Sequence, residues 1–124
     1  MDQEGKFMDS AEYSYSVKSE ISGFNEQNPR NWIDALKFSI GELKNRNAAA
    51  VASLQAIGIA GHMHGAILLD KNDEILHPCI LWNDTRSYKQ ASILDQDVKL
   101  QEITGNIIFP GFTAPKLLWI QENK

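Results

Sequence analysis

Residues 111–123 read Gly-Phe-Thr-Ala-Pro-Lys-Leu-Leu-Trp-Ile-Gln-Glu-Asn, a stretch with the features of a capped amphipathic helix. The Thr113 hydroxyl can accept hydrogen bonds from backbone N–H groups of the next turn, and Pro115 suits the first turn. We predict a helix that begins there, with Lys116 and Gln121 pointing away from its buried face. No Gly-rich loop precedes Lys116, which favours a solvated or structural lysine over a phosphate-binding one. The buried face would consist of Leu117, Leu118 and Ile120.

Upstream of this helix, short apolar segments are typical of strands. Residues 54–60 are almost continuously apolar, as in a strand that is buried on both faces of a sheet. Residues 66–69 and 74–76 flank an Asp-Lys-Asn-Asp turn, which predicts a hairpin. Residues 79–82 form a further short apolar segment, and residues 13–17 alternate apolar and polar side chains as a half-buried strand does.

Two more helices are indicated between and after these segments. Asn28 and Pro29 are typical of an N-cap and a first helical position, and apolar residues at helical spacing follow as far as about residue 45. Residues 48–51 either continue that helix or lead into a linker. Asn83 or Asp84 can cap a later helix, and Gly105 suits its end. Its shared face would consist of Tyr88, Ala91, Leu94 and Val98.

The composition and the order of elements predict one mixed α/β domain of a soluble globular protein. The chain has 124 residues and a formal net charge of −4, without a cluster of Lys and Arg. This balance argues against a nucleic-acid partner, which needs a basic patch. No apolar run approaches the roughly 20 residues that span a bilayer, and the acidic N-terminus is not typical of a signal peptide. The single cysteine, Cys79, excludes an internal disulfide and fits a reducing cytoplasm.

Two polar segments lie at the ends of predicted strands, where ligands collect in open α/β sheets. His64 lies in the Gly-His-Met-His-Gly sequence of residues 61–65, and a neutral imidazole offers a sugar both a donor and an acceptor. Trp82 and Asp84 follow the apolar segment at 79–82. An indole can stack on the carbon face of a sugar, beside a carboxylate that accepts from hydroxyls. The alternatives are that His64 is a core or turn histidine, that Trp82 is core, and that Asp84 only caps a helix.

A metal site is a rival interpretation. His62 and His64 are two residues apart, as are His77 and Cys79, and alternate residues on a strand share a face. Pro78 stiffens the second pair, however, and the sequence identifies no carboxylate that would orient the histidines. We therefore expect no metal ion, and interpret Cys79 as a small buried hydrophobe and His77 as a loop residue.

The helical stretch and several upstream segments together resemble the FGGY family of carbohydrate kinases, and within it the xylulokinases. The stretch has the family's order of small residue, hydroxyl, Lys, apolar, Trp, apolar and amide, and the resemblance covers nearly the whole chain. It implies a fold of the α/β class, part of an actin-like or ribonuclease-H-like sugar-kinase N-terminal domain. The matching segments are residues 25–32, 58–66, 80–86, 103–106 and 110–116.

The resemblance implies a kinase that uses ATP and Mg²⁺ to phosphorylate D-xylulose. It places Met63 and His64 against the ketose, with His64 bonding a hydroxyl and Met63 packing on the apolar face or adding a backbone contact. It places Trp82 and Asp84 at the border of the substrate, with Arg86 ordering their loop. Glycerol enzymes of the family carry an Arg-Glu pair where Met63 and His64 stand, so this pair favours xylulose.

The resemblance also implies that residues 1–124 are part of the sugar-binding domain, without the first phosphate-loop strands, the catalytic aspartate or the C-terminal nucleotide domain. We therefore expect no catalytic residue, no cofactor and no kinase activity in this chain alone. An unpaired sheet edge would invite self-association. The alternatives are another FGGY kinase with a different sugar, a non-catalytic sugar-binding or structural module, and a small metal-binding protein.

Overall fold

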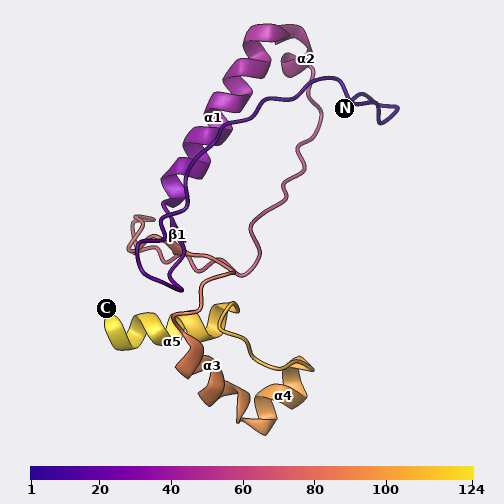
Figure 1. The fold of residues 1–124 in the computed structure, drawn as a ribbon. Coiled ribbons are helices and arrows are strands. Elements are labelled where there is room, and N and C mark those ends of the chain that lie inside the picture. The colour runs from indigo at the N-terminus through magenta and orange to yellow at the C-terminus, as the bar shows by residue number, and fades with distance from the viewer. The chain divides into compact units, whose positions relative to one another are not determined.

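The computed structural model describes all residues from 1 to 124 and contains five helices and one two-stranded sheet (Figure 1). The chain forms two compact units, which we describe separately. The first unit comprises residues 1–16 and 30–60, and the second comprises residues 17–29 and 61–124. The helices are α1 (Pro29–Arg46), α2 (Ala48–Ala52), α3 (Tyr88–Asp95), α4 (Val98–Thr104) and α5 (Thr113–Asn123), and the strands are β1 (Glu26–Gln27) and β2 (Cys79–Ile80).

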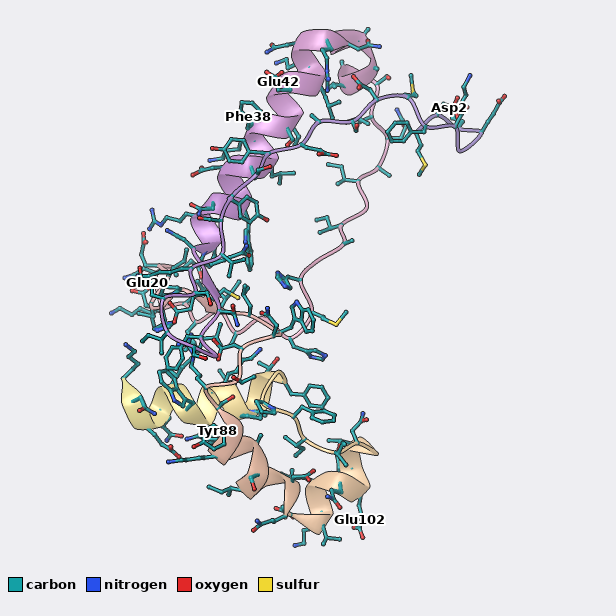
Figure 2. All side chains as sticks on the ribbon, in the orientation of Figure 1. Asp2, Glu20, Phe38, Glu42, Tyr88 and Glu102 are labelled. Atoms are coloured by element: carbon teal, nitrogen blue, oxygen red, sulfur yellow. The ribbon has the colours of Figure 1, made fainter.

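Helix α1 dominates the first unit. Its start at Pro29 and its end at Arg46 confirm the predicted helix, and proline suits this first position because its fixed φ is already helical. The ring of Phe38, which is labelled on α1 in Figure 2, packs against that of Tyr13, with 5.0 Å between the ring centroids. Arg46 pairs with Asp9 at 3.3 Å. The N-terminal segment is thereby attached along α1.

Residues 48–51 belong to a separate short helix, which settles the choice left open by the sequence. Asn47 separates α1 from α2 as the N-cap residue of α2, and its side-chain oxygen accepts from the backbone nitrogen of Ala50 at 3.0 Å. An Asn at this position satisfies a backbone donor that the first turn leaves free. The break therefore has a local cause.

Two predicted strands do not form. Residues 13–17 make no ladder, and Tyr13, Tyr15 and Val17 are all exposed. Residues 54–60 are extended and exposed rather than buried, with Ile59 91% exposed. A strand obtains its hydrogen bonds from neighbouring strands, and no strand in residues 1–124 pairs with either segment.

The sheet and the hairpin lie in the second unit. Strands β1 and β2 are antiparallel, with Glu26 opposite Ile80. Single bridges join Ala66 to Ile80 and Leu69 to Ile75. The Asp70 carboxylate accepts from the backbone nitrogens of Asn72 and Glu74 at 2.7 and 2.9 Å, which closes the turn. The hairpin and the short segment beginning at Cys79 are therefore confirmed.

Helices complete the second unit, and α3 and α5 lie side by side (Figure 1). The predicted helix after Asp84 is two helices, because Asp97 caps α4 by accepting from the backbone nitrogen of Lys99 at 2.9 Å. Its stop at Gly105 is confirmed, with a left-handed φ of 64°. The first residue of α3, Tyr88, is labelled in Figure 2 and is exposed. None of the five helices is both long and apolar enough to cross a membrane.

The start of α5 corrects a prediction. Phe112 is the N-cap residue and Thr113 is already helical, without the predicted side-chain cap. Lys116 was expected to point away from the buried face but is completely buried, next to buried Pro115. The small core around them consists of Ala66, Cys79, Ile80, Leu81 and Ala91.

Candidate functional site

The segment with Met63 and His64 forms an exposed turn. His64 has a φ of 56°, in the left-handed region that residues with a Cβ seldom adopt, and this conformation costs roughly 1–2 kcal/mol. Its ring lies against that of Phe112, with 4.9 Å between centroids. Met63 is 68% exposed. His64 is therefore an exposed turn residue, outside the core, whose imidazole packs against the ring of Phe112.

Lys116 reaches this turn from α5. Its Nζ donates to the carbonyl oxygen of His64 at 2.7 Å and to that of Gly111 at 2.8 Å. Burial lowers the pKa of the Lys116 ammonium, and the negative charge of Asp84 opposes that effect. A hydrogen bond from a charged donor contributes about 1.5–3 kcal/mol, which is enough to offset the cost of the left-handed His64. The solvated interpretation of Lys116 is thus wrong, and it is a structural lysine.

The Trp82 loop meets the same junction. Gly111 lies so close to this loop that a methyl group on it would overlap the carbonyl oxygen of Trp82. The Trp82 side chain is 53% exposed, so the interpretation of this indole as core is wrong. Two loops with predicted substrate residues, at His64 and at Trp82, therefore both contact Gly111 or the lysine bound to it.

Asp84 lies below the surface, where it is engaged by protein groups. Its Oδ2 accepts from the Nη2 of Arg86 at 2.8 Å and from the backbone nitrogen of Asn25 at 2.6 Å. Its Oδ1 accepts from the backbone nitrogen of Arg86 at 2.9 Å. Asp84 does not cap α3, whose N-cap residue is Ser87. Its carboxylate instead fastens the loop after β2 to the segment before β1.

Arg86 completes this buried cluster. Its Nη1 donates to Oε1 of Glu26 at 2.6 Å, and its guanidinium lies 3.9 Å from the ring centroid of Phe24 and 5.0 Å from that of Trp119. Planar guanidinium groups favour such bidentate and stacked arrangements. The predicted role of Arg86 in ordering the loop has a physical basis in these contacts.

A cavity of about 370 Å³ borders the cluster but contains none of the predicted substrate residues. Several of the polar side chains that line it lie close to one another. Lys18 is 3.5 Å from Glu20, and the Nε2 of His77 is 4.0 Å from the Oε1 of Glu26. The candidate site is therefore the exposed surface of the His64 and Trp82 loops and not this cavity.

The rival metal arrangement is not formed. Nowhere in residues 1–124 do three or more His, Cys, Asp or Glu side chains gather in a way that could hold a metal ion. Cys79 is completely buried. His77 has its Nδ1 2.6 Å from the carbonyl oxygen of Pro78. The side chains exposed at the His64 and Trp82 loops are an imidazole, an indole and a thioether.

The burial of Cys79 predicts low thiol reactivity. Burial raises the pKa of the Cys79 thiol, with the charge of Lys116 opposing it, so the reactive thiolate is scarce at pH 8. We expect an aromatic disulfide reagent to react at least about tenfold more slowly with the native chain than with the chain in urea, because local opening must come first. Equal rates in the two states would show that the β2 core is open.

The sequence did not identify Lys116, Gly111 and Phe112 as neighbours of the site. They belong to the stretch that predicted α5, but nothing local in that stretch indicates contact with residues about 30 to 50 positions earlier. Met63, His64 and Trp82 are exposed and Asp84 is buried. Their predicted contacts with a substrate stay predictions.

The chain matches known proteins over its whole length. Residues 1–124 match the FGGY family of carbohydrate kinases, N-terminal domain. A xylulose kinase of Escherichia coli K12 is 42% identical over 102 residues, which are 82% of this chain and 21% of that protein. Among solved structures, a xyloylose kinase from Brucella ovis is 49% identical with a TM-score of 0.85, over 87% of this chain and 23% of that one. A gluconate kinase from Lactobacillus acidophilus is 26% identical with a TM-score of 0.86, over 98% and 25%.

These matches confirm the predicted resemblance and the predicted fold class, part of an actin-like sugar-kinase N-terminal domain. The chain spans only about a fifth to a quarter of the length of the proteins it matches.

Proposed function

Because the chain belongs to the FGGY family of carbohydrate kinases, we propose that it forms part of the sugar-binding domain of a kinase that phosphorylates D-xylulose. The observation that carries the proposal is the convergence of the His64 and Trp82 loops on Gly111 and Lys116. This convergence brings to one junction two of the residues that the family pattern assigns to the sugar. The xylulose kinases it matches at 42% and 49% identity support the choice of substrate.

Each exposed residue has a role in this proposal. The His64 imidazole exchanges a hydrogen bond with a sugar hydroxyl, while Met63 packs on the apolar side of the ketose. Trp82 supplies a flat apolar surface for the carbon face. Asp84 acts mainly from below, because its oxygens already accept from Arg86 and Asn25. In this proposal the Asp84 carboxylate holds the Trp82 loop in place, and the loop in turn borders the substrate.

A sugar acid such as gluconate is the second candidate, since one matched structure is a gluconate kinase. A carboxylate ligand needs a cation or several free donors. The cations next to the junction are occupied, Lys116 by two carbonyl oxygens and Arg86 by Asp84 and Glu26. This part of the site therefore favours a neutral ketose.

ATP and Mg²⁺ belong to the complete kinase in this proposal. When bound, they supply the γ-phosphate and offset its charge during transfer to the sugar hydroxyl. Residues 1–124 gather no set of side chains that fits a metal ion, so we assign to this chain only the orientation of the sugar. We propose that the chain alone does not transfer phosphate, and that residues 1–124 are one part of the sugar-binding domain.

The test is the replacement His64→Ala in a complete kinase that contains this chain. A hydrogen bond to a neutral hydroxyl contributes about 0.5–1.5 kcal/mol. Its loss should therefore lower kcat/KM for D-xylulose at least roughly two- to tenfold. A coupled ADP-release assay measures the effect. The control is Cys79→Ala, which removes a completely buried thiol that cannot touch a bound sugar, and it should lower stability without changing the sugar dependence. Identical kinetics for the two variants would refute the sugar-binding role of His64.

A further inference from the structure

Lys116 is placed unusually for a lysine. Its side chain is completely buried, yet its Nζ contacts two backbone carbonyl oxygens that lie in different loops, 52 and 5 residues away along the chain. Burying an ammonium is unfavourable unless polar groups satisfy it, and an apolar residue would fill the same space without that cost. Lys116 therefore does more than fill space, because its ammonium donates hydrogen bonds to both carbonyl oxygens.

One of those carbonyl groups belongs to the most strained residue of the candidate site. His64 adopts a left-handed backbone conformation, which persists only when surrounding contacts hold it. The bond from Lys116 is such a contact, and it fixes the peptide that follows the imidazole. The ring then rests on Phe112, which itself lies next to the other bound loop.

The second carbonyl group extends the effect to Trp82. Lys116 holds Gly111, and the backbone of Gly111 lies directly against the carbonyl oxygen of Trp82. The Lys116 ammonium is thus in direct contact with the backbone of His64 and of Gly111, and one further contact away from the backbone of Trp82.

We propose that Lys116 is a positioning residue of the sugar site, which orients His64 and Trp82 through the carbonyl groups of His64 and Gly111 without touching the sugar. This inference rests on the proposed function. It goes beyond that function because a buried residue in the first turn of α5 sets the affinity for the ketose. Burial and the two bonds leave Lys116 no route to the phosphate of a substrate.

The first test reads the His64 ring in the 124-residue chain by NMR, without any sugar. Lys116→Met keeps most of the length of the side chain and removes its donors. We expect the ring resonances of His64 to move toward their values in an unfolded peptide, because the ring leaves Phe112. The matched control is Lys99→Met on the exposed surface of α4, which should leave these resonances unchanged. Unchanged His64 resonances in a folded Lys116→Met chain would overturn the proposal.

The second test measures both Michaelis constants in a complete kinase that contains this chain. Lys116→Met should raise KM for D-xylulose about tenfold and leave KM for ATP as it is. A merely structural role would reduce the amount of active enzyme and leave both constants unchanged, which would contradict the proposal. If Lys116→Met does not fold, Lys116→Gln, which keeps one donor group, takes its place. Loss of the native fold in both variants would also overturn the proposal, because Lys116 would then act on the whole unit.

The two tests separate this inference from the proposed function. A wild-type kinase that does not use D-xylulose would refute the proposed substrate, while the His64 resonances would still report whether Lys116 holds the turn. Conversely, activity on D-xylulose with an unaltered KM in Lys116→Met would leave the proposed function intact and remove the positioning role.

Discussion

Replacing Arg86 by Met is expected to lower the free energy of unfolding of the chain by about 3–5 kcal/mol. The Arg86 side chain is only 2% exposed and that of Asp84 is fully buried. Without the guanidinium, the Asp84 carboxylate would be buried with only backbone donors beside it. Such an uncompensated charge is far more costly than the loss of one contact. Urea unfolding followed by fluorescence gives the free energy and its slope.

The matched control makes the same replacement at an exposed ion pair. Arg46→Met removes a pair with Asp9 in which both side chains are more than two-fifths exposed, and should cost about 0–1 kcal/mol. Arg86→Lys is expected to lie between the two, because an ammonium cannot match the bidentate and stacked geometry. Equal losses for Arg86→Met and Arg46→Met would show that the Asp84 cluster is not buried in solution.

The sequence predicted the helices and the hairpin because their hydrogen bonds are local. Pro29 and the apolar spacing after it fixed the start and the extent of α1, and Asp70 specified the hairpin turn through bonds to residues two and four positions away. The small errors at these elements are also local. Asn47 and Asp97 each cap a new helix where the periodic pattern indicated a continuous one or left the choice open.

The strands were harder to predict because a strand is completed by its partner. Residues 54–60 have the composition of a buried strand, but burial and pairing depend on segments that the pattern does not name. In this structure the segment is extended and exposed, with Ile57 and Ile59 open to solvent. The strand predicted at residues 13–17 does not form for the same reason.

The candidate site divides in a similar way. Residue type and family pattern assign Met63, His64 and Trp82 to the candidate site; the structure shows that they are exposed, and their contacts with a sugar stay predictions. The burial of Lys116 could not be predicted, because its partners are backbone carbonyl groups, which every residue carries. Asp84 has the residue type of a ligand, but its actual partners are Arg86 and Asn25. Tertiary contacts decided both cases.

Gly111→Ala is expected to lower the free energy of unfolding by about 3 kcal/mol, toward the upper end for overpacked sites. The added methyl group would overlap the carbonyl oxygen of Trp82, and both groups are attached to backbone, so no side chain can turn aside to relieve the overlap. The loops must separate, which also lengthens the bond from Lys116 to the Gly111 carbonyl oxygen. Urea unfolding measures the loss, and the fluorescence of Trp82 should change with it.

The same replacement at Gly41 should have the opposite sign. Gly41 lies inside α1, and a methyl group added there would meet nothing within 4 Å. Alanine in a helix interior is favoured over glycine by about 0.8–1.0 kcal/mol, so Gly41→Ala should stabilise the chain. The pair of variants separates close approach from intrinsic propensity, because the chemical change is identical. A stabilising effect at both positions would mean that Gly111 does not touch the Trp82 loop, and the junction that joins the two halves of the proposed sugar site would be lost.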